Sequence, residues 1–161
     1  MVKETWLDFG ELTNRKATDK IVIHHVGGAN RDFTAQEIHG WHKNQGWSGV
    51  GYHYVIRKDG TVERGRPHWT IGAHAEGENW HTIGINVAGD FDIGQPEQAQ
   101  VEALSALCAD ICSAYGLSTE VIVGHRDVGQ TSCPGENLYA LLQTIRGKAE
   151  WYLHNKERDA I

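Results

Sequence analysis

The sequence lacks the features that would assign it to several specialised classes of protein. It contains no run of about 18 apolar residues, the length that a transmembrane helix needs, so we expect no insertion into a membrane. The N-terminal segment has no apolar stretch of signal-peptide type, so synthesis in the cytoplasm without a signal peptide is expected. No Lys/Arg-rich run occurs and the formal net charge is −6, which argues against nucleic acid as a partner.

Cysteine is also scarce, with three residues in the chain. Cys108 and Cys112 are four residues apart in a helix-like segment, where we expect both to be small buried side chains. An odd number of cysteines without an obvious pairing argues against a disulfide framework.

The 161 residues contain no internal repeat, low-complexity tract or linker, which indicates a single domain. Short β-branched runs alternate with segments of helical periodicity, so the predicted class is α/β, with a mixed central sheet flanked by helices. Thr34 and Glu37 form a Thr-x-x-Glu capping box at a predicted helix start. The predicted strands lie in 19–28, 52–57, 61–64, 81–91 and 119–125, and the predicted helices in 34–46, 95–116 and 137–155.

Histidine, in contrast, is abundant, with ten residues, which directs attention to metal or acid–base chemistry. The segment "GHRDVGQTSCPG" (124–135) follows a strand-like run and contains His125 and Cys133. An imidazole and a thiolate are good zinc ligands. The same pair also fits a cysteine nucleophile with His125 as its base and Asp127 as the orienting acid, or two ordinary loop residues.

A zinc site would need a third protein ligand from another segment. The run "IVIHHVGG" offers His24 and His25 at the end of a predicted strand, and "GYHYV" offers His53. Adjacent strand residues point to opposite sides, so at most one of His24 and His25 faces a given site. The spacing alone does not choose among the three.

Four segments, in order, resemble a known family: "IVIHHVGG", "WHKNQGWSGVGYHYVIRKDGTVERGRP", "IGAHAEGENWHTIGINVAGDF" and "GHRDVGQTSCPG". They are similar to the zinc-dependent N-acetylmuramoyl-L-alanine amidases of the type 2 class, which include phage endolysins and peptidoglycan recognition proteins. The resemblance runs from about residue 18 to 145. It implies a peptidoglycan recognition protein-like fold, with 1–161 as one catalytic domain and no separate cell-wall-binding domain.

The resemblance also implies roles for individual residues. It implies that Zn²⁺ is bound by His24, His125 and Cys133, and that Tyr52 and Thr131 are catalytic. Phage members of the family often have lysine at the position of Thr131, so this chain has a hydroxyl group where those members have a cation.

The expected substrate-binding residues are His74, Asn79 and Arg66, the last as a partner for a peptide carboxylate. His39 and His42, three apart on the predicted helix, are expected to pack or to face solvent rather than to bind a metal. Four tryptophans are candidates for the edge of the substrate groove: Trp41, Trp47, Trp69 and Trp80.

The expected activity is hydrolysis of the amide bond between N-acetylmuramic acid and L-alanine in peptidoglycan, by a monomeric phage or prophage endolysin. Release would occur through a holin-type pore or host lysis. Two alternatives stay open: a recognition domain that binds peptidoglycan without turnover, and a zinc peptidase that cuts the stem peptide. The intact His/His/Cys ligand set favours catalysis over binding alone.

Overall fold

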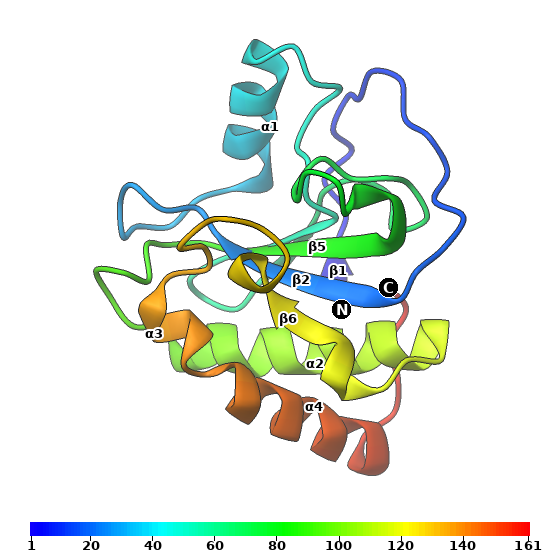
Figure 1. The fold of residues 1–161 in the computed structure, drawn as a ribbon, viewed down its shortest axis with the longest axis vertical. Coiled ribbons are helices and arrows are strands. Elements are labelled where there is room, and N and C mark those ends of the chain that lie inside the picture. Colours follow the sequence, from blue (N-terminus) through cyan, green and yellow to red (C-terminus); the bar gives the residue numbers. More distant parts are fainter.

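A six-stranded mixed sheet forms the centre of the molecule (Figure 1). The computed structural model describes residues 1–161. The strands are β1 (Val2–Lys3), β2 (Lys20–His25), β3 (Tyr54–Ile56), β4 (Val62–Arg64), β5 (Thr82–Val87) and β6 (Ile122–Gly124). Their order is β1-β4-β3-β5-β2-β6, and the β3–β4 hairpin is the antiparallel pair among otherwise parallel neighbours.

Helices cover both faces of this sheet. They are α1 (Ala35–Asn44), α2 (Gln98–Tyr115), α3 (Glu136–Tyr139) and α4 (Leu142–Asn155). Figure 1 shows α2 and α4 side by side against one face and α1 over the other. The predicted α/β class with a mixed, helix-flanked sheet is confirmed.

Alternation along the strands decides which side chains reach each face. Ile21 and Ile23 of β2 belong to the larger hydrophobic core, which includes residues of α2 and α4. His24 therefore points to the opposite face, where α1 and a smaller core lie. His25 points to the face on which Phe91 lies. Its Nδ1 accepts a hydrogen bond from the backbone N–H of Phe91 at 3.0 Å. The expectation that the two adjacent histidines diverge is confirmed.

The helix starting at Thr34 is confirmed: its hydroxyl accepts the N–H of Glu37 at 3.0 Å. The Glu37 carboxylate pairs with Arg31 rather than completing the capping box. The strand predicted at 119–125 is shorter, because 119–121 form a 3-10 turn.

The single helix predicted at 137–155 is in fact two helices, α3 and α4. The first is tied to the loop after β5, since Asn137 donates to the carbonyls of Phe91 and Gly94. The second packs along α2. The two helices thus contact different parts of the molecule, the first the loop after β5 and the second α2.

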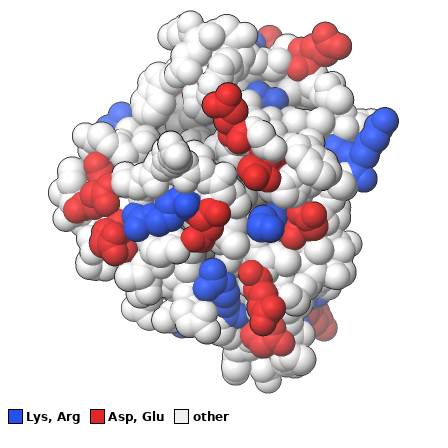
Figure 2. All heavy atoms as spheres, in the orientation of Figure 1, with Lys and Arg blue, Asp and Glu red and all other residues white.

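Charged side chains of both signs are interspersed on the face shown in Figure 2, without a large patch of either sign. None of the helices combines the length and the apolar character that spanning a bilayer requires.

A close backbone contact fixes the segment before Tyr52 against the segment before His74. The N–H of Ala73 donates to the carbonyl of Gly51 at 2.9 Å, and a Cβ added at Gly51 would lie 1.9 Å from the Ala73 carbonyl oxygen. The absence of a side chain at Gly51 is therefore required for these two segments to lie this close together.

We expect Gly51→Ala to destabilise the fold by roughly 1–3 kcal/mol, because the two segments must separate. Gly40→Ala is the matched control, since a Cβ at this position in α1 meets nothing within 4 Å. It should leave stability unchanged or raise it by up to about 1 kcal/mol. Urea denaturation measures both, and equal stabilities of the two variants would contradict the packing argument.

Candidate metal centre and substrate groove

His24, His125 and Cys133 converge at one point beside the carboxyl ends of β2 and β6. Each offers one ligand atom, and these atoms lie within 4.8 Å of one another. His24 is 1 % exposed, whereas His125 and Cys133 are half-buried. The His24 and His125 rings have centroids 4.5 Å apart. Of the three candidates for the third ligand, the structure brings His24 to this point; His25 and His53 lie elsewhere, each with Nδ1 accepting a backbone N–H.

The spacing of these atoms fits a tetrahedral metal ion. Nδ1 of His24 lies 3.7 Å from Sγ of Cys133. Zinc–nitrogen and zinc–sulfur bonds of about 2.0–2.1 Å and 2.3 Å at a tetrahedral angle place the two ligand atoms about 3.6 Å apart. The ligand set, with two imidazoles and one thiol, is also typical of zinc sites that keep a fourth position open.

The environment of Cys133 argues against the nucleophile alternative. Burial raises the pKa of its thiol to about 12, so without a bound cation the sulfur is protonated at neutral pH. The backbone N–H of His25 points at Sγ from 3.4 Å and lowers the pKa in part. A bound metal ion stabilises the thiolate directly. The sulfur is therefore better suited to bind a metal than to attack a substrate.

His74 lies behind His24 and contacts it directly. Nδ1 of His74 is 2.9 Å from Nε2 of His24, and its own Nε2 is 3.1 Å from Oγ1 of Thr82. Burial lowers the pKa of His74 to about 3 and the pKa of His24 well below its usual range, so both rings are neutral at pH 7. Both nitrogens of His74 are engaged within the protein, and the residue also lines the groove described below, so its contact with substrate stays a prediction.

Tyr52 is preceded by a loop that three side chains hold in place. His39 and His42, one turn apart on α1, accept the N–H groups of Val50 and Gly51 through Nδ1 at 3.0 and 2.9 Å. Arg66 is 6 % exposed and donates to the carbonyls of Val50, Gly49 and Ile71. Its guanidinium thus serves to hold backbone carbonyls, and the role of Arg66 as a partner for a peptide carboxylate stays a prediction.

The ring of Tyr52 lies 5.0 Å from that of His24, between centroids. Burial raises the pKa of its hydroxyl to about 12, which keeps the proton on the oxygen at neutral pH. The buried side chain of Asn86 is close enough to lower this pKa in part, and its strand register places it beside His24. The hydroxyl is thus a hydrogen-bond donor next to the metal position.

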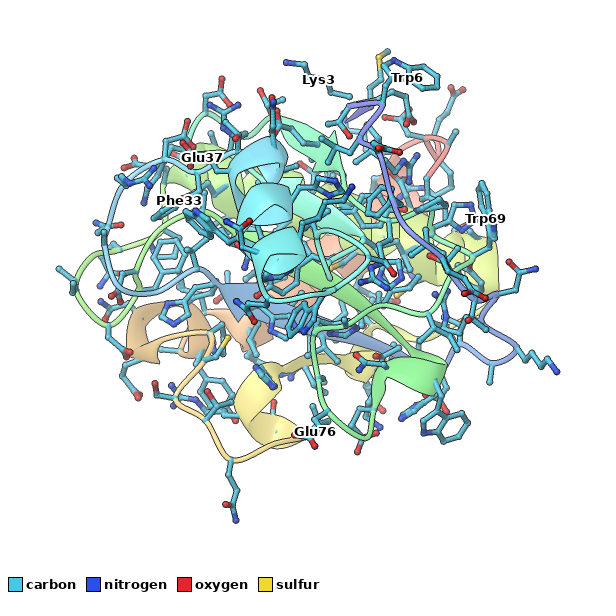
Figure 3. All side chains as sticks on the ribbon, turned by 90° about the horizontal axis from the view of Figure 1, so that it is seen from above. Lys3, Trp6, Phe33, Glu37, Trp69 and Glu76 are labelled. Atoms are coloured by element: carbon cyan, nitrogen blue, oxygen red, sulfur yellow. The ribbon has the colours of Figure 1, made fainter.

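A groove of about 420 Å³ runs along this site. It is lined by His42, Trp47, Tyr52, Ala73, His74, Ala75, Glu76, Gly77 and Asn79. Oδ1 of Asn79 accepts the N–H groups of His74 and Ala75, so this side chain shapes the loop at the groove's edge. Figure 3 shows Glu76 on this loop and Trp69 projecting from a distant edge of the molecule.

His42 and Trp69 depart from the expectations about the groove. His42 contributes to the groove wall as well as packing, with a pKa lowered to about 4 by burial and by Arg66. Trp69 lines a separate pocket with Trp6, so of the four candidate tryptophans Trp47 is the one on the groove. Helical spacing of His39 and His42 pointed to a shared face, but the loop that they hold could be identified only in three dimensions.

Thr131 lies on the exposed loop that leads to Cys133. Its hydroxyl oxygen accepts the backbone N–H of Cys133 at 3.1 Å. This bond fixes the oxygen and leaves the hydroxyl hydrogen free to donate.

Comparisons with known proteins agree with this geometry. Residues 14–136 match the family described as N-acetylmuramoyl-L-alanine amidase. The chain belongs to this amidase family. It is 38% identical over 134 residues to the endolysin of Klebsiella phage KP32, covering 80% of this chain and 87% of the relative. It is 35% identical to peptidoglycan-recognition protein SC2 of Drosophila melanogaster, covering 87% and 85% of the two chains. The solved structure of the amidase LysC from Clostridium intestinale superposes with a TM-score of 0.86 at 35% identity, covering 93% and 97%.

The ionisation of this amidase's ligand set predicts how metal affinity depends on pH. Cys133, with a pKa of about 12, must lose a proton when a metal binds, whereas burial already lowers the pKa of His24 and His125 below 6.5. Around pH 7 one proton is released, so zinc affinity should rise about tenfold per pH unit.

Competition titrations against a chelator at several pH values measure this slope. The control is Cys112→Ser, which replaces a buried thiol outside the candidate site and should show the same slope. A zinc affinity that does not change with pH would contradict the assignment of Cys133 as a ligand.

Proposed function

We propose that this protein is a zinc-dependent endolysin that hydrolyses the amide bond between N-acetylmuramic acid and L-alanine in peptidoglycan. The observation that carries the proposal is the convergence of His24, His125 and Cys133 beside a groove, in a chain of the amidase family. The phage endolysin relatives support the bacterial cell wall as the place of action.

In this proposal, His24 and His125 supply nitrogen ligands and Cys133 a thiolate to a zinc ion. When bound, a zinc ion supplies Lewis-acid chemistry that polarises a carbonyl group and acidifies water. Tyr52 donates its hydroxyl hydrogen to the carbonyl oxygen of the scissile amide as negative charge develops there. Thr131, held by the N–H of Cys133, directs a second hydroxyl hydrogen toward the same region. Asn79 contacts the substrate from the groove's edge.

We expect Tyr52→Phe to lower kcat by about 10²–10³-fold, because it removes one hydrogen-bond donor to the developing oxyanion. KM and zinc content should stay near those of the unsubstituted protein. Tyr152→Phe is the control, since its hydroxyl donates to Glu102 at 2.9 Å in a contact between α4 and α2. If Tyr52→Phe kept full kcat, Tyr52 would be a wall of the groove and not a catalytic donor.

The products of digested cell wall test the bond that is cut. An amidase releases peptides with a free L-alanine amino group, and a peptidase leaves L-alanine attached to the muramoyl group. We expect free L-alanine termini from the unsubstituted protein and from Cys112→Ser, and none from Cys133→Ser or after chelation. New termini within the stem peptide would identify a peptidase. Wall binding that survives chelation, without any new amine from the zinc-loaded protein, would identify a recognition domain.

A further inference from the structure

A chain of buried hydrogen bonds leads from a backbone carbonyl to the metal ligand His24. The hydroxyl of Thr82 donates to the carbonyl of Glu78 at 2.8 Å. The same oxygen lies 3.1 Å from Nε2 of His74, and Nδ1 of His74 lies 2.9 Å from Nε2 of His24. The side chains in this chain of hydrogen bonds are buried: Thr82 is 0 % exposed, and His24 and His74 are also buried.

The direction of every bond in this chain follows from its first member. A hydroxyl has one hydrogen, and Thr82 gives it to the Glu78 carbonyl, which can only accept. The Thr82 oxygen must therefore accept from Nε2–H of His74. A neutral imidazole carries one hydrogen, so Nδ1 of His74 is bare and must accept from Nε2–H of His24. Nδ1 of His24 is then left with a free lone pair, and this atom faces Cys133 at 3.7 Å.

We propose that Thr82 is a positioning residue of the amidase, which fixes the tautomers of His74 and His24 so that Nδ1 of His24 is available to the metal. Reversal of the chain shows why its direction matters. If Thr82 donated to His74 instead, the Glu78 carbonyl would lose its 2.8 Å hydroxyl donor and keep the longer 3.4 Å bond from the N–H of His81, and His24 would receive a hydrogen bond at Nε2. His24 would then carry its hydrogen on Nδ1, the atom that must bind the metal.

The most direct test reads the tautomers in the zinc-loaded protein with ¹⁵N-labelled histidine. We expect the NMR spectra to show His74 protonated at Nε2, and His24 protonated at Nε2 with Nδ1 bound to zinc. A hydrogen on Nδ1 of His74, or zinc bound through Nε2 of His24, would overturn the proposal. This measurement needs no substitution, so it decides the question even if a variant fails to fold.

Substitutions test the energetic consequence. Thr82→Val removes the hydroxyl at nearly constant volume and should weaken zinc binding about 10–100-fold in a chelator competition, with a mixture of His74 tautomers. Thr82→Ser keeps the hydroxyl and should retain the affinity. Thr70→Val is the matched control, because the buried hydroxyl of Thr70 donates to the Pro67 carbonyl at 2.8 Å without contacting a ring nitrogen. Unchanged zinc affinity and a single Nε2–H tautomer of His74 in Thr82→Val would refute the role of Thr82.

This inference rests on the proposed metal site but not on the bond that is cut. Tautomers and zinc affinity are measured without cell wall. A protein that binds zinc through His24 with the expected tautomers but releases no L-alanine termini would refute the proposed activity alone. A lytic protein with the opposite His74 tautomer would refute the positioning role alone.

Discussion

The register between β2 and β6 is the constraint on which the site depends. These strands run parallel, and Ile23 lies opposite Gly124. The next residue in the chain after each of these two is a histidine, so His24, still on β2, and His125, directly after β6, lie side by side at the carboxyl ends. A slip of one residue would turn His24 toward the large hydrophobic core. The apolar side chains Ile21 and Ile23, both fully buried in that core, therefore fix the positions of two candidate metal ligands.

The third candidate ligand, Cys133, lies on a loop that folds back on the same strands. The N–H of Arg126 donates to the carbonyl of Cys133 at 2.9 Å, and the N–H of His25 points at its sulfur. The two ends of the segment 126–133 are thereby joined next to β2. Around this centre, His74 satisfies the far nitrogen of His24, while His39, His42 and Arg66 hold the loop before Tyr52. Buried polar groups are stable when they have hydrogen-bond partners, and these side chains have them.

Much of this arrangement could be predicted from the sequence, and the remainder shows where such prediction ends. The α/β class, the strand before His24, the helix start at Thr34 and the grouping of His24, His125 and Cys133 could all be predicted, because they rest on local patterns or on four ordered motifs. The backbone contacts of Arg66 could not be predicted, because an arginine that binds backbone carbonyls has the same local pattern as one that faces a ligand. The second contact of His74 could not be predicted for a related reason: Thr82 is eight residues away in the chain, and the two side chains meet only because the loop and the 3-10 turn between them fold back on β5.

The central claim is that one zinc ion is bound by His24, His125 and Cys133. X-ray absorption at the zinc edge of the loaded protein tests it most directly, because sulfur and nitrogen ligands differ in bond length. The account predicts one sulfur at about 2.3 Å and two imidazole nitrogens at about 2.0–2.1 Å, with the sulfur signal absent in Cys133→Ser. A first coordination shell of nitrogen and oxygen alone in the unsubstituted protein would contradict it.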